Sequence, residues 1–211
     1  DVPAVVLLTE FDNQNDEERY LKIQSAQEII NQHAYDSIIK HKPEEETQLW
    51  KLRRSAAAVM WTIPGSKKAL PIIEDGTVPP HKLSEFITRA YEIFEKYDLE
   101  IAIWGHAGDA DLHMQPFMDL SKTTDRKKLF VMTDEFYNMV HELGGTAAGE
   151  HNDSLMRAVY QPLMFGPEMS KLFNDVKHIF DPDNLLNPHK KVGVDFNYVK
   201  KHLRHSYSIE S

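Results

Sequence analysis

The sequence contains no cysteine, so disulfide bonds, thiolate metal sites and cysteine nucleophiles are all excluded. Its nine glycines nowhere form a G-x-G-x-x-G or a G-x-x-x-x-G-K-S/T motif, so the chain carries no phosphate-binding loop of its own. The longest apolar run, at residues 3–8, is far shorter than the roughly 20 residues of a membrane-spanning helix. We therefore expect no membrane span.

Positive charge is also scarce, with 24 Lys and Arg against 33 Asp and Glu, a formal net charge of −9 and a pI of about 5.6. A field of that sign disfavours nonspecific binding to nucleic acid or anionic lipid, so we expect no nucleic-acid partner. The acidic start lacks the basic region of a signal peptide, and the chain begins at Asp1 without a methionine. We expect a cytoplasmic piece of a longer protein.

Strand and helix patterns are mixed along the 211 residues, which are enough to bury a full core. They predict strands at 4–11, 35–41, 69–73, 99–104 and 112–117, and helices at 17–32, from 43 onward, and at 80–94, 129–140 and 169–180. This order favours an α+β fold, a mostly antiparallel ferredoxin-like sheet covered by helices. Two β-α-β halves, at about 4–41 and 70–118, indicate a duplication, and residues 196–211 are expected to form a solvated tail.

Histidine is unusually frequent, and two of the eleven histidines lie in the dense segment Gly105–His113. On one continuous strand His106 and His113 would face opposite ways, because the side-chain period is two. A turn at Gly108-Asp109 would instead bring both rings to the mouth of a hairpin, where neutral imidazoles suit a divalent transition metal. The alternative is a polar turn with two incidental surface histidines.

A second segment, Gly144–Asp153, combines three glycines with adjacent Glu150 and His151. Because neighbouring side chains project in different directions, one could bind a metal while the other faces a substrate. A set of His106, His113 and Glu150 would leave coordination positions open. The alternative is a glycine-rich helix end, followed by a new helix whose dipole Glu150 complements.

A third segment, Trp50–Arg54, carries two arginines, the residue type suited to bidentate binding of a carboxylate. The alternative is a solvated helix face.

At these segments the sequence resembles the C-terminal (cap) domain of FAD-linked oxidases of the vanillyl-alcohol-oxidase type. The motifs that carry the resemblance follow in order along nearly the whole chain. They are W-x-x-R at 50–53, E-D-x-x-V-P at 74–79, G-H-x-G-D-G-N-L-H at 105–113, G-G-x-x-x-x-E-H at 144–151 and the closing D-P-x-x-x-L-N-P-G-K at 181–190.

The resemblance implies that residues 1–195 form the cap and substrate domain of a two-part enzyme, whose N-terminal FAD-binding domain is absent from this chain. It implies a dehydrogenase or oxidase of small D-2-hydroxy acids with an electron acceptor as a further partner, through which the protein could attach peripherally to a membrane. The fragment alone would be inactive. The roles implied for single residues are a divalent metal (zinc, manganese or iron) on His106, His113 and Glu150, a general base at His151, substrate binding at Arg53 and Gln115, and flavin contact at Asn187.

Several positions depart from the family pattern. Ala57 lies where some dicarboxylate-using relatives carry a hydroxyl, and Ile73 where they carry a second cation, so the resemblance favours a short, apolar-tailed substrate resembling lactate or glycolate. Asp111 replaces the usual Asn and adds negative charge beside the expected metal. Two other functions stay open: a stand-alone metal-dependent hydrolase centred on two histidines and a carboxylate, and a non-catalytic ferredoxin-like binding module.

Overall fold

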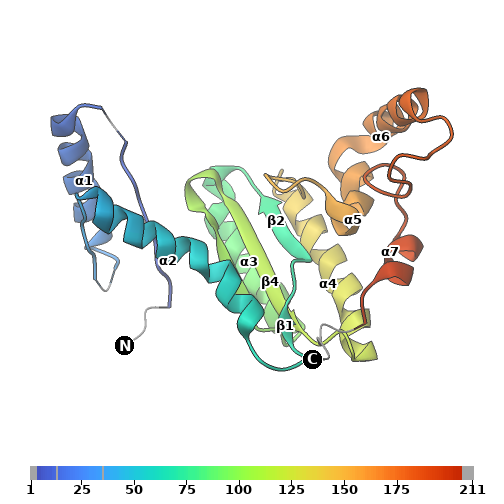
Figure 1. The fold of residues 1–211 in the computed structure, drawn as a ribbon, viewed down its shortest axis with the longest axis horizontal. Coiled ribbons are helices and arrows are strands. Elements are labelled where there is room, and N and C mark those ends of the chain that lie inside the picture. The colour runs from blue at the N-terminus through green and yellow to red at the C-terminus, as the bar shows by residue number, and fades with distance from the viewer. Residues whose placement is uncertain (1–3, 13, 35, 206–211) are drawn as a thin grey trace. The chain divides into compact units, whose positions relative to one another are not determined.

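The structure, a computed structural model, describes residues 4–12, 14–34 and 36–205 (Figure 1). The chain divides into two compact units, one ending at Val59 and the other beginning at Met60.

The first unit contributes two helices, α1 (Asp16–Ile30) and most of α2 (Pro43–Thr62), both close to where the sequence predicts them. Helix α1 begins where the Asn15 side chain accepts the backbone N–H groups of Glu17 and Glu18, at 2.9 and 3.2 Å. Helix α2 begins at a proline followed by three glutamates, which the positive end of the helix dipole favours.

The strands expected at 4–11 and 35–41 are wrong. Residues 4–12 and 36–41 contain no strand, and residue 35 lies outside the described part of the chain. The side chains of Val5, Val6 and Leu7 are 66–80% exposed, although they are the residues that suggested a buried strand. A β-branched run forms a strand only where another strand takes up its backbone hydrogen bonds. The first half of the expected duplication is therefore not formed in these residues.

The second unit contains an antiparallel sheet, which confirms the mixed α+β class. Its strands are β1 (Lys68–Ala69), β2 (Ile73–Thr77), β3 (Ile101–His106) and β4 (Asp111–Met118). Strand β4 pairs with β3 along one edge and with both β1 and β2 along the other (Figure 1). It is therefore the central strand of the sheet.

Strands β1 and β2 replace the single strand expected at 69–73. Pro71 lacks the N–H group that a ladder requires, and residues 70–72 form a turn instead. The segment Glu74–Gly76, expected to be a loop, is the middle of β2. This difference places two acidic side chains on a strand of the sheet.

Helices α3 (Leu83–Lys96) and α4 (Thr123–Glu142) lie side by side and cover one face of the sheet (Figure 1). The apolar spacing that predicted α3 buries Phe86 and Phe94, which contact Phe136 of α4 with ring centroids 5.8 and 6.3 Å apart. Leu112 and Met114 of β4 join this core. Because side chains alternate along a strand, Asp111, His113 and Gln115 lie on the opposite face of the sheet.

The remaining elements are short turns and the C-terminal helices. They are η1 (Pro80–Lys82), η2 (Ala107–Asp109), α5 (Ser154–Arg157), η3 (Ala158–Tyr160), α6 (Gln161–Phe180) and α7 (Phe196–His202). Helix α7 lies in the segment expected to be a solvated tail, yet Val199 is buried and Phe196 contacts the Tyr160 ring, with centroids 5.7 Å apart. The described part of that segment is packed on the unit. No helix among the described residues is both long enough and apolar enough to span a membrane.

Candidate functional site

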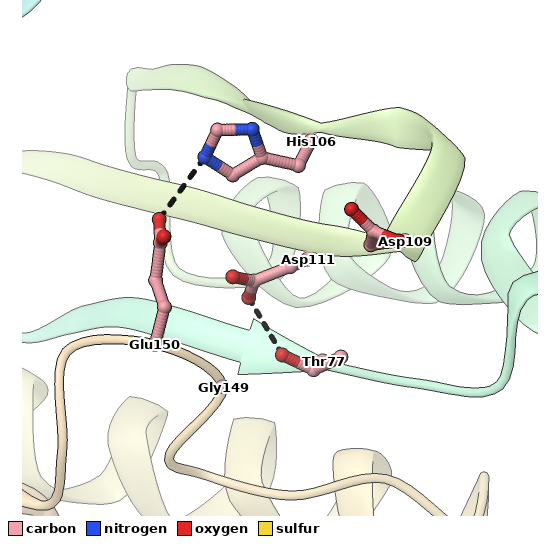
Figure 2. A pocket seen from close by; sticks show the side chains of 6 residues that line it. All are labelled: Thr77, His106, Asp109, Asp111, Gly149 and Glu150. Atoms are coloured by element: carbon pink, nitrogen blue, oxygen red, sulfur yellow. Dashed lines mark hydrogen bonds and ion pairs between the residues drawn. The ribbon is translucent and has the colours of Figure 1, made fainter.

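Three histidines converge on one carboxylate on the sheet face opposite the α3–α4 core. The Oε1 atom of Glu150 lies 3.1 Å from His106 Nε2, 2.9 Å from His113 Nε2 and 3.5 Å from His151 Nε2. Figure 2 shows His106 and Glu150 facing each other across the pocket. The structure thus brings together the three residues expected to bind a metal, with the expected base beside them.

The hairpin between β3 and β4 sets the positions of His106 and His113. Its turn is η2 followed by Ala110, which has a left-handed backbone with φ of 52°. Two residues before the turn's start, Gly105 packs so closely against β4 that a Cβ atom there would lie 2.3 Å from the Asp111 carbonyl oxygen. A glycine is therefore required for the pairing that brings the end of β3 over β4.

Hydrogen bonds from β2 hold the loop that carries Glu150 and His151. Thr77, at the end of β2, exchanges two backbone hydrogen bonds with Thr146, at 3.1 and 2.8 Å. The fully buried Asp75 carboxylate accepts the backbone N–H groups of Glu150 and His151, at 3.2 and 3.1 Å. A charged acceptor makes such bonds stronger than neutral ones, so the loop is pinned beside the two histidines of the hairpin.

The tautomer of His113 follows from its surroundings. Its Nδ1 atom lies 2.7 Å from the backbone oxygen of Glu74, and a carbonyl oxygen only accepts, so Nδ1 carries the proton. In the neutral ring, Nε2 then offers a lone pair to the space it shares with Glu150. His113 is buried, and ligating histidines typically donate their second N–H to a carbonyl in this manner.

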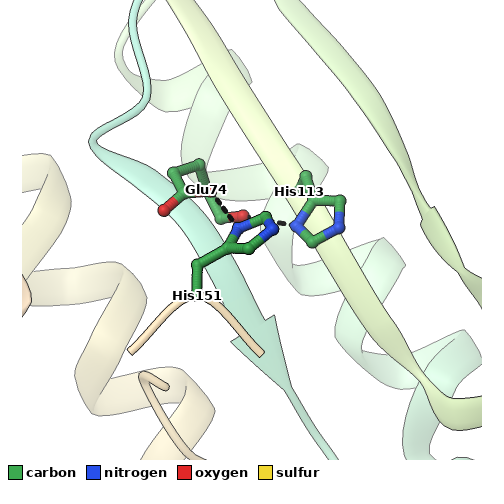
Figure 3. Close-up of side chains that lie close together, drawn as sticks. All are labelled: Glu74, His113 and His151. Carbon is green, nitrogen blue, oxygen red and sulfur yellow. Dashed lines mark hydrogen bonds and ion pairs between the residues drawn. The ribbon is translucent and has the colours of Figure 1, made fainter. Parts of the chain in front are cut away.

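His151 is held in the same manner by a side chain. Its Nδ1 atom lies 2.7 Å from Glu74 Oε2, and its ring stacks on His113 with centroids 4.6 Å apart and planes 22° apart (Figure 3). Partial burial lowers the pKa of His151, but the hydrogen bond to Glu74 and the charges of Glu74, Asp75 and Glu150 outweigh burial and raise that pKa overall. The ring therefore holds a proton more tightly than an ordinary imidazole does.

Burial and nearby charges also shift the pKa values of Glu150 and Asp111, in opposite directions. Burial raises the pKa of Glu150, but the charges of the three surrounding histidines outweigh it and lower that pKa. Burial raises the pKa of Asp111; a hydrogen bond from Thr77, 2.6 Å long, opposes the rise, and the charges of Asp75 and Glu150 add to it. Acidic groups thus crowd one side of the histidine cluster.

A pocket of about 310 Å³ opens beside Glu150. Figure 2 shows the residues that line it, which are Thr77, His106, Asp109, Asp111, Gly149 and Glu150.

The donor set fits a divalent cation. The Nε2 lone pair of His113 and the Glu150 oxygen are both acceptors, and at 2.9 Å they need a proton or a cation between them. Two imidazole nitrogens and a carboxylate oxygen are ligands suited to zinc, manganese or iron. Ligand atoms of His106, His113 and Glu150 lie within 4.8 Å of one another. His113 belongs to two further groups whose ligand atoms lie within the same distance of one another. One group adds Glu74 and His151, and the other adds Asp75 and Asp111.

The family follows from a sequence comparison with known proteins. A family model described as "FAD linked oxidases, C-terminal domain" matches residues 2–191. The chain belongs to this family. This FAD-linked oxidase domain therefore combines a histidine cluster with membership of a flavoenzyme family.

Curated relatives of the FAD-linked oxidase domain are oxidoreductases by name. The glycolate oxidase subunit GlcD of Bacillus subtilis is 33% identical over 152 residues, which are 72% of this chain and 32% of the relative. A D-lactate dehydrogenase of Anaerostipes hadrus is 29% identical over 87% of this chain and 38% of its own length. The D-2-hydroxyglutarate dehydrogenase of Escherichia coli is 29% identical over 68% of this chain and 14% of its own length. The chain spans 14–38% of these relatives.

The other expected site residues of the FAD-linked oxidase domain lie in different places. Gln115 lies on β4 two residues beyond His113; it is buried, and its Oε1 atom has no hydrogen-bond partner among the described residues. Asn187 lies in the loop between α6 and α7. Arg53 lies on α2 in the first unit, whereas the histidine cluster belongs wholly to the second.

Sequence reasoning assigned no role to Glu74, Asp75 or Arg157, which surround the cluster. The buried Arg157 guanidinium pairs with Glu74 Oε1 and donates to the backbone oxygen of Asn152. Two adjacent acidic residues after the apolar pair Ile72-Ile73 were a usable signal, because buried carboxylates require partners. Nothing local to Arg157 distinguishes it from a surface arginine.

Proposed function

We propose that this domain is the cap and substrate domain of an FAD-dependent oxidoreductase that oxidises a small D-2-hydroxy acid, resembling lactate or glycolate, to the 2-oxo acid. The observation that carries the proposal is the convergence of His106, His113 and His151 on Glu150, in a chain of the FAD-linked oxidase family. The names of the relatives, which include glycolate oxidase, D-lactate dehydrogenase and D-2-hydroxyglutarate dehydrogenase, support this reaction class.

In this proposal His106, His113 and Glu150 hold a divalent metal. A bound metal supplies Lewis-acid polarisation of the substrate's hydroxyl and carboxylate oxygens, and a bound flavin supplies the hydride acceptor. The three residues orient the 2-hydroxyl group beside His151. Glu150 is the only carboxylate among them, so the three ligands and a divalent ion would together carry one positive charge, which attracts an anionic substrate.

His151 acts as the general base. Its Nδ1 proton points to Glu74, so Nε2 is the atom that accepts the proton of the substrate's 2-hydroxyl group. As that O–H bond breaks, the C=O bond forms and the hydrogen on C2 leaves with its electron pair. Arg53 is the proposed partner of the substrate carboxylate, Gln115 contacts the substrate through its side-chain amide, and Asn187 contacts the flavin.

Two features favour a substrate with one carboxylate. Ile73, which stands where dicarboxylate-using relatives are expected to carry a cation, is fully buried in the core and offers no charge. The pocket beside Glu150 is lined by Asp109 and Asp111, whose negative charges repel a second carboxylate. Lactate or glycolate suits this surface better than 2-hydroxyglutarate.

The proposal includes an N-terminal FAD-binding domain and an electron acceptor as partners, because the chain spans only 14–38% of its relatives. Exposed apolar side chains on α6 could contribute to contact with the FAD-binding domain. They are Phe165, Met169, Leu172, Val176 and Ile179. A cytoplasmic location, with any membrane attachment provided by the electron acceptor, belongs to the same proposal.

The test uses the full-length enzyme with D-lactate, glycolate and D-2-hydroxyglutarate and a dye as electron acceptor. We expect turnover of the first two and about one equivalent of metal, which His106→Ala removes. His151→Ala should lower kcat by about 10²–10⁴-fold with unchanged FAD content, because a general base contributes that much. Metal-dependent hydrolysis without flavin would favour a hydrolase. Absence of both metal and turnover would favour a binding module.

A further inference from the structure

Glu74 contacts two imidazoles of the site, those of the buried His113 and the exposed His151, through different atoms. Its backbone oxygen accepts the Nδ1 proton of His113, and its carboxylate atom Oε2 accepts the Nδ1 proton of His151, each at 2.7 Å (Figure 3). Both rings thereby turn Nε2 toward Glu150, which lies 2.9 Å from one Nε2 and 3.5 Å from the other. One residue of β2 thus determines which nitrogen is protonated in two rings.

Arg157 holds the Glu74 carboxylate in one orientation. The guanidinium side chain is only 1% exposed, pairs with Glu74 Oε1 and lies 4.0 Å from the buried Asp75 carboxylate. The two Glu74 oxygens are therefore divided between Arg157 and His151. Because arginine has donors and no acceptor, it can only bind an oxygen at this position.

We propose that Glu74 is a positioning residue of the reaction, which holds His151 in the Nδ1-protonated tautomer, and that Arg157 fixes the Glu74 carboxylate for this role. The inference rests on the proposed function, in which Nε2 of His151 takes the proton of the substrate hydroxyl. The Glu74 carboxylate also stabilises the imidazolium that forms when His151 gains this second proton.

Substitution of Glu74 separates its two contacts. The bond to His113 uses the backbone oxygen and survives any change of the side chain, so the metal-binding set should stay intact. The bond to His151 uses the side chain and is lost or reversed. Metal content and catalysis should therefore respond differently to the same substitution.

Glutamine is the decisive replacement, because its amide has one accepting and one donating end. Arg157 will take the amide oxygen, which turns the NH₂ group toward His151 Nδ1. Nδ1 must then accept, which moves the proton to Nε2 and removes the lone pair that the base requires. Alanine leaves Nδ1 without a partner but does not force the wrong tautomer. The nearly isosteric glutamine should therefore impair catalysis more than alanine does.

The experiment compares Glu74→Gln and Glu74→Ala in the full-length enzyme with Glu135→Gln as the matched control. Glu135 likewise shares its carboxylate between two donors, Lys96 and the Tyr97 hydroxyl, each at 2.8 Å, but lies on α4 outside the site. We expect kcat to fall about 10²–10⁴-fold in Glu74→Gln and less in Glu74→Ala, with KM changed less than about threefold. Glu135→Gln should keep wild-type kcat.

Two readouts do not depend on turnover. Metal content should be unchanged in both Glu74 variants. In ¹⁵N-histidine NMR spectra of the metal-free protein, the His151 signals should show a protonated Nδ1 in the wild type and a protonated Nε2 in Glu74→Gln. Loss of metal, or a kcat lower in the alanine variant than in the glutamine variant, would show a merely structural role and overturn the inference.

The failure of the inference is distinguishable from that of the proposed function. If His151→Ala lowers kcat and Glu74→Gln does not, the base assignment stands and the role of Glu74 is wrong. If His151→Ala leaves kcat unchanged, the proposed base itself is wrong, and the positioning role is overturned with it.

Discussion

Gly149 offers a sharp test of how tightly the loop before Glu150 must pack. A Cβ atom at this position would lie 2.1 Å from Thr77 Oγ1 and 2.6 Å from Asp111 Oδ1, whereas an ordinary van der Waals contact begins at 3.4 Å. The first distance falls short by more than 1 Å. Thr77 Oγ1 and Asp111 Oδ1 are held by a hydrogen bond of 2.6 Å. In Gly149→Ala we therefore expect the loop to move rather than these two side chains.

The size of that movement sets the expected effect. A shift of about 1 Å exceeds the tolerance of about 0.2 Å in metal–ligand distances, and comparable misplacement at active sites costs about 100-fold in rate. We expect metal affinity to fall at least about 10-fold and kcat/KM about 100-fold in Gly149→Ala. Overpacking should also cost about 1–3 kcal/mol of stability, at about 2–4 °C in unfolding midpoint for each kcal/mol.

The assays are metal titration, steady-state kinetics and thermal unfolding of the full-length enzyme. Gly108→Ala is the matched control, because no atom lies within 4 Å of a Cβ placed at that position of the β3–β4 turn. Thr77→Ala combined with Gly149→Ala removes the closest contact and should restore part of the loss. Wild-type metal affinity and kcat/KM in Gly149→Ala would refute the reasoning.

Three further predictions concern stability and the loop. Phe136→Ala removes a fully buried ring from between α3 and the sheet, and it should lower the free energy of unfolding in urea by about 3–5 kcal/mol. The control Phe165→Ala removes a side chain that is 46% exposed and should lower that free energy by under about 1 kcal/mol. Equal losses in the two variants would place the core elsewhere. Asp75→Asn replaces one of the two oxygens that accept the N–H groups of Glu150 and His151 by an NH₂ donor. Metal affinity should therefore drop about 10–100-fold. An unchanged affinity would show that this carboxylate does not hold the loop in place. The hydrogen bond from Lys177 holds the pKa of Asp181 below its usual value, against the opposing effect of burial. The ionised Asp181 therefore stabilises the fold above about pH 4, and this stabilisation is lost as the pH falls through the lowered pKa. Asp181→Asn should therefore lower the unfolding midpoint at pH 7, and this effect should shrink as the pH falls below about 4. A difference that does not shrink in acid would contradict this linkage.

The elements that depend only on residues close to one another in the sequence could be predicted from it. Helix α3 follows from apolar residues at helical spacing, and β3 and β4 follow from two apolar runs around a Gly-Asp turn. The strands expected at 4–11 and 35–41 failed because a strand also needs a partner that its own residues do not specify. Residues 73–77 were missed for a related reason, since Glu74 and Asp75 look polar until their distant partners are known.

The candidate site, like the fold, could be predicted from the sequence only in part. The seven-residue spacing of His106 and His113 around a turn indicated that they meet, and the resemblance to a family joined Glu150 and His151 to them. The Glu74–Arg157 pair joins residues 83 positions apart in the chain. No local pattern encodes such a pair, so it became visible only in the folded domain.

The candidate site joins a histidine of the central strand, His113, to two loop residues, Glu150 and His151, which are held less firmly. His113 lies on β4, which is paired along both edges, so its amide hydrogen should exchange with solvent only when the whole unit unfolds. Glu150 and His151 are held through their two N–H groups on Asp75, and those amides can exchange after the loop alone opens. Such a local opening withdraws one proposed metal ligand and the proposed base while the sheet stays intact. We therefore expect the candidate site to open and form again without unfolding of the domain.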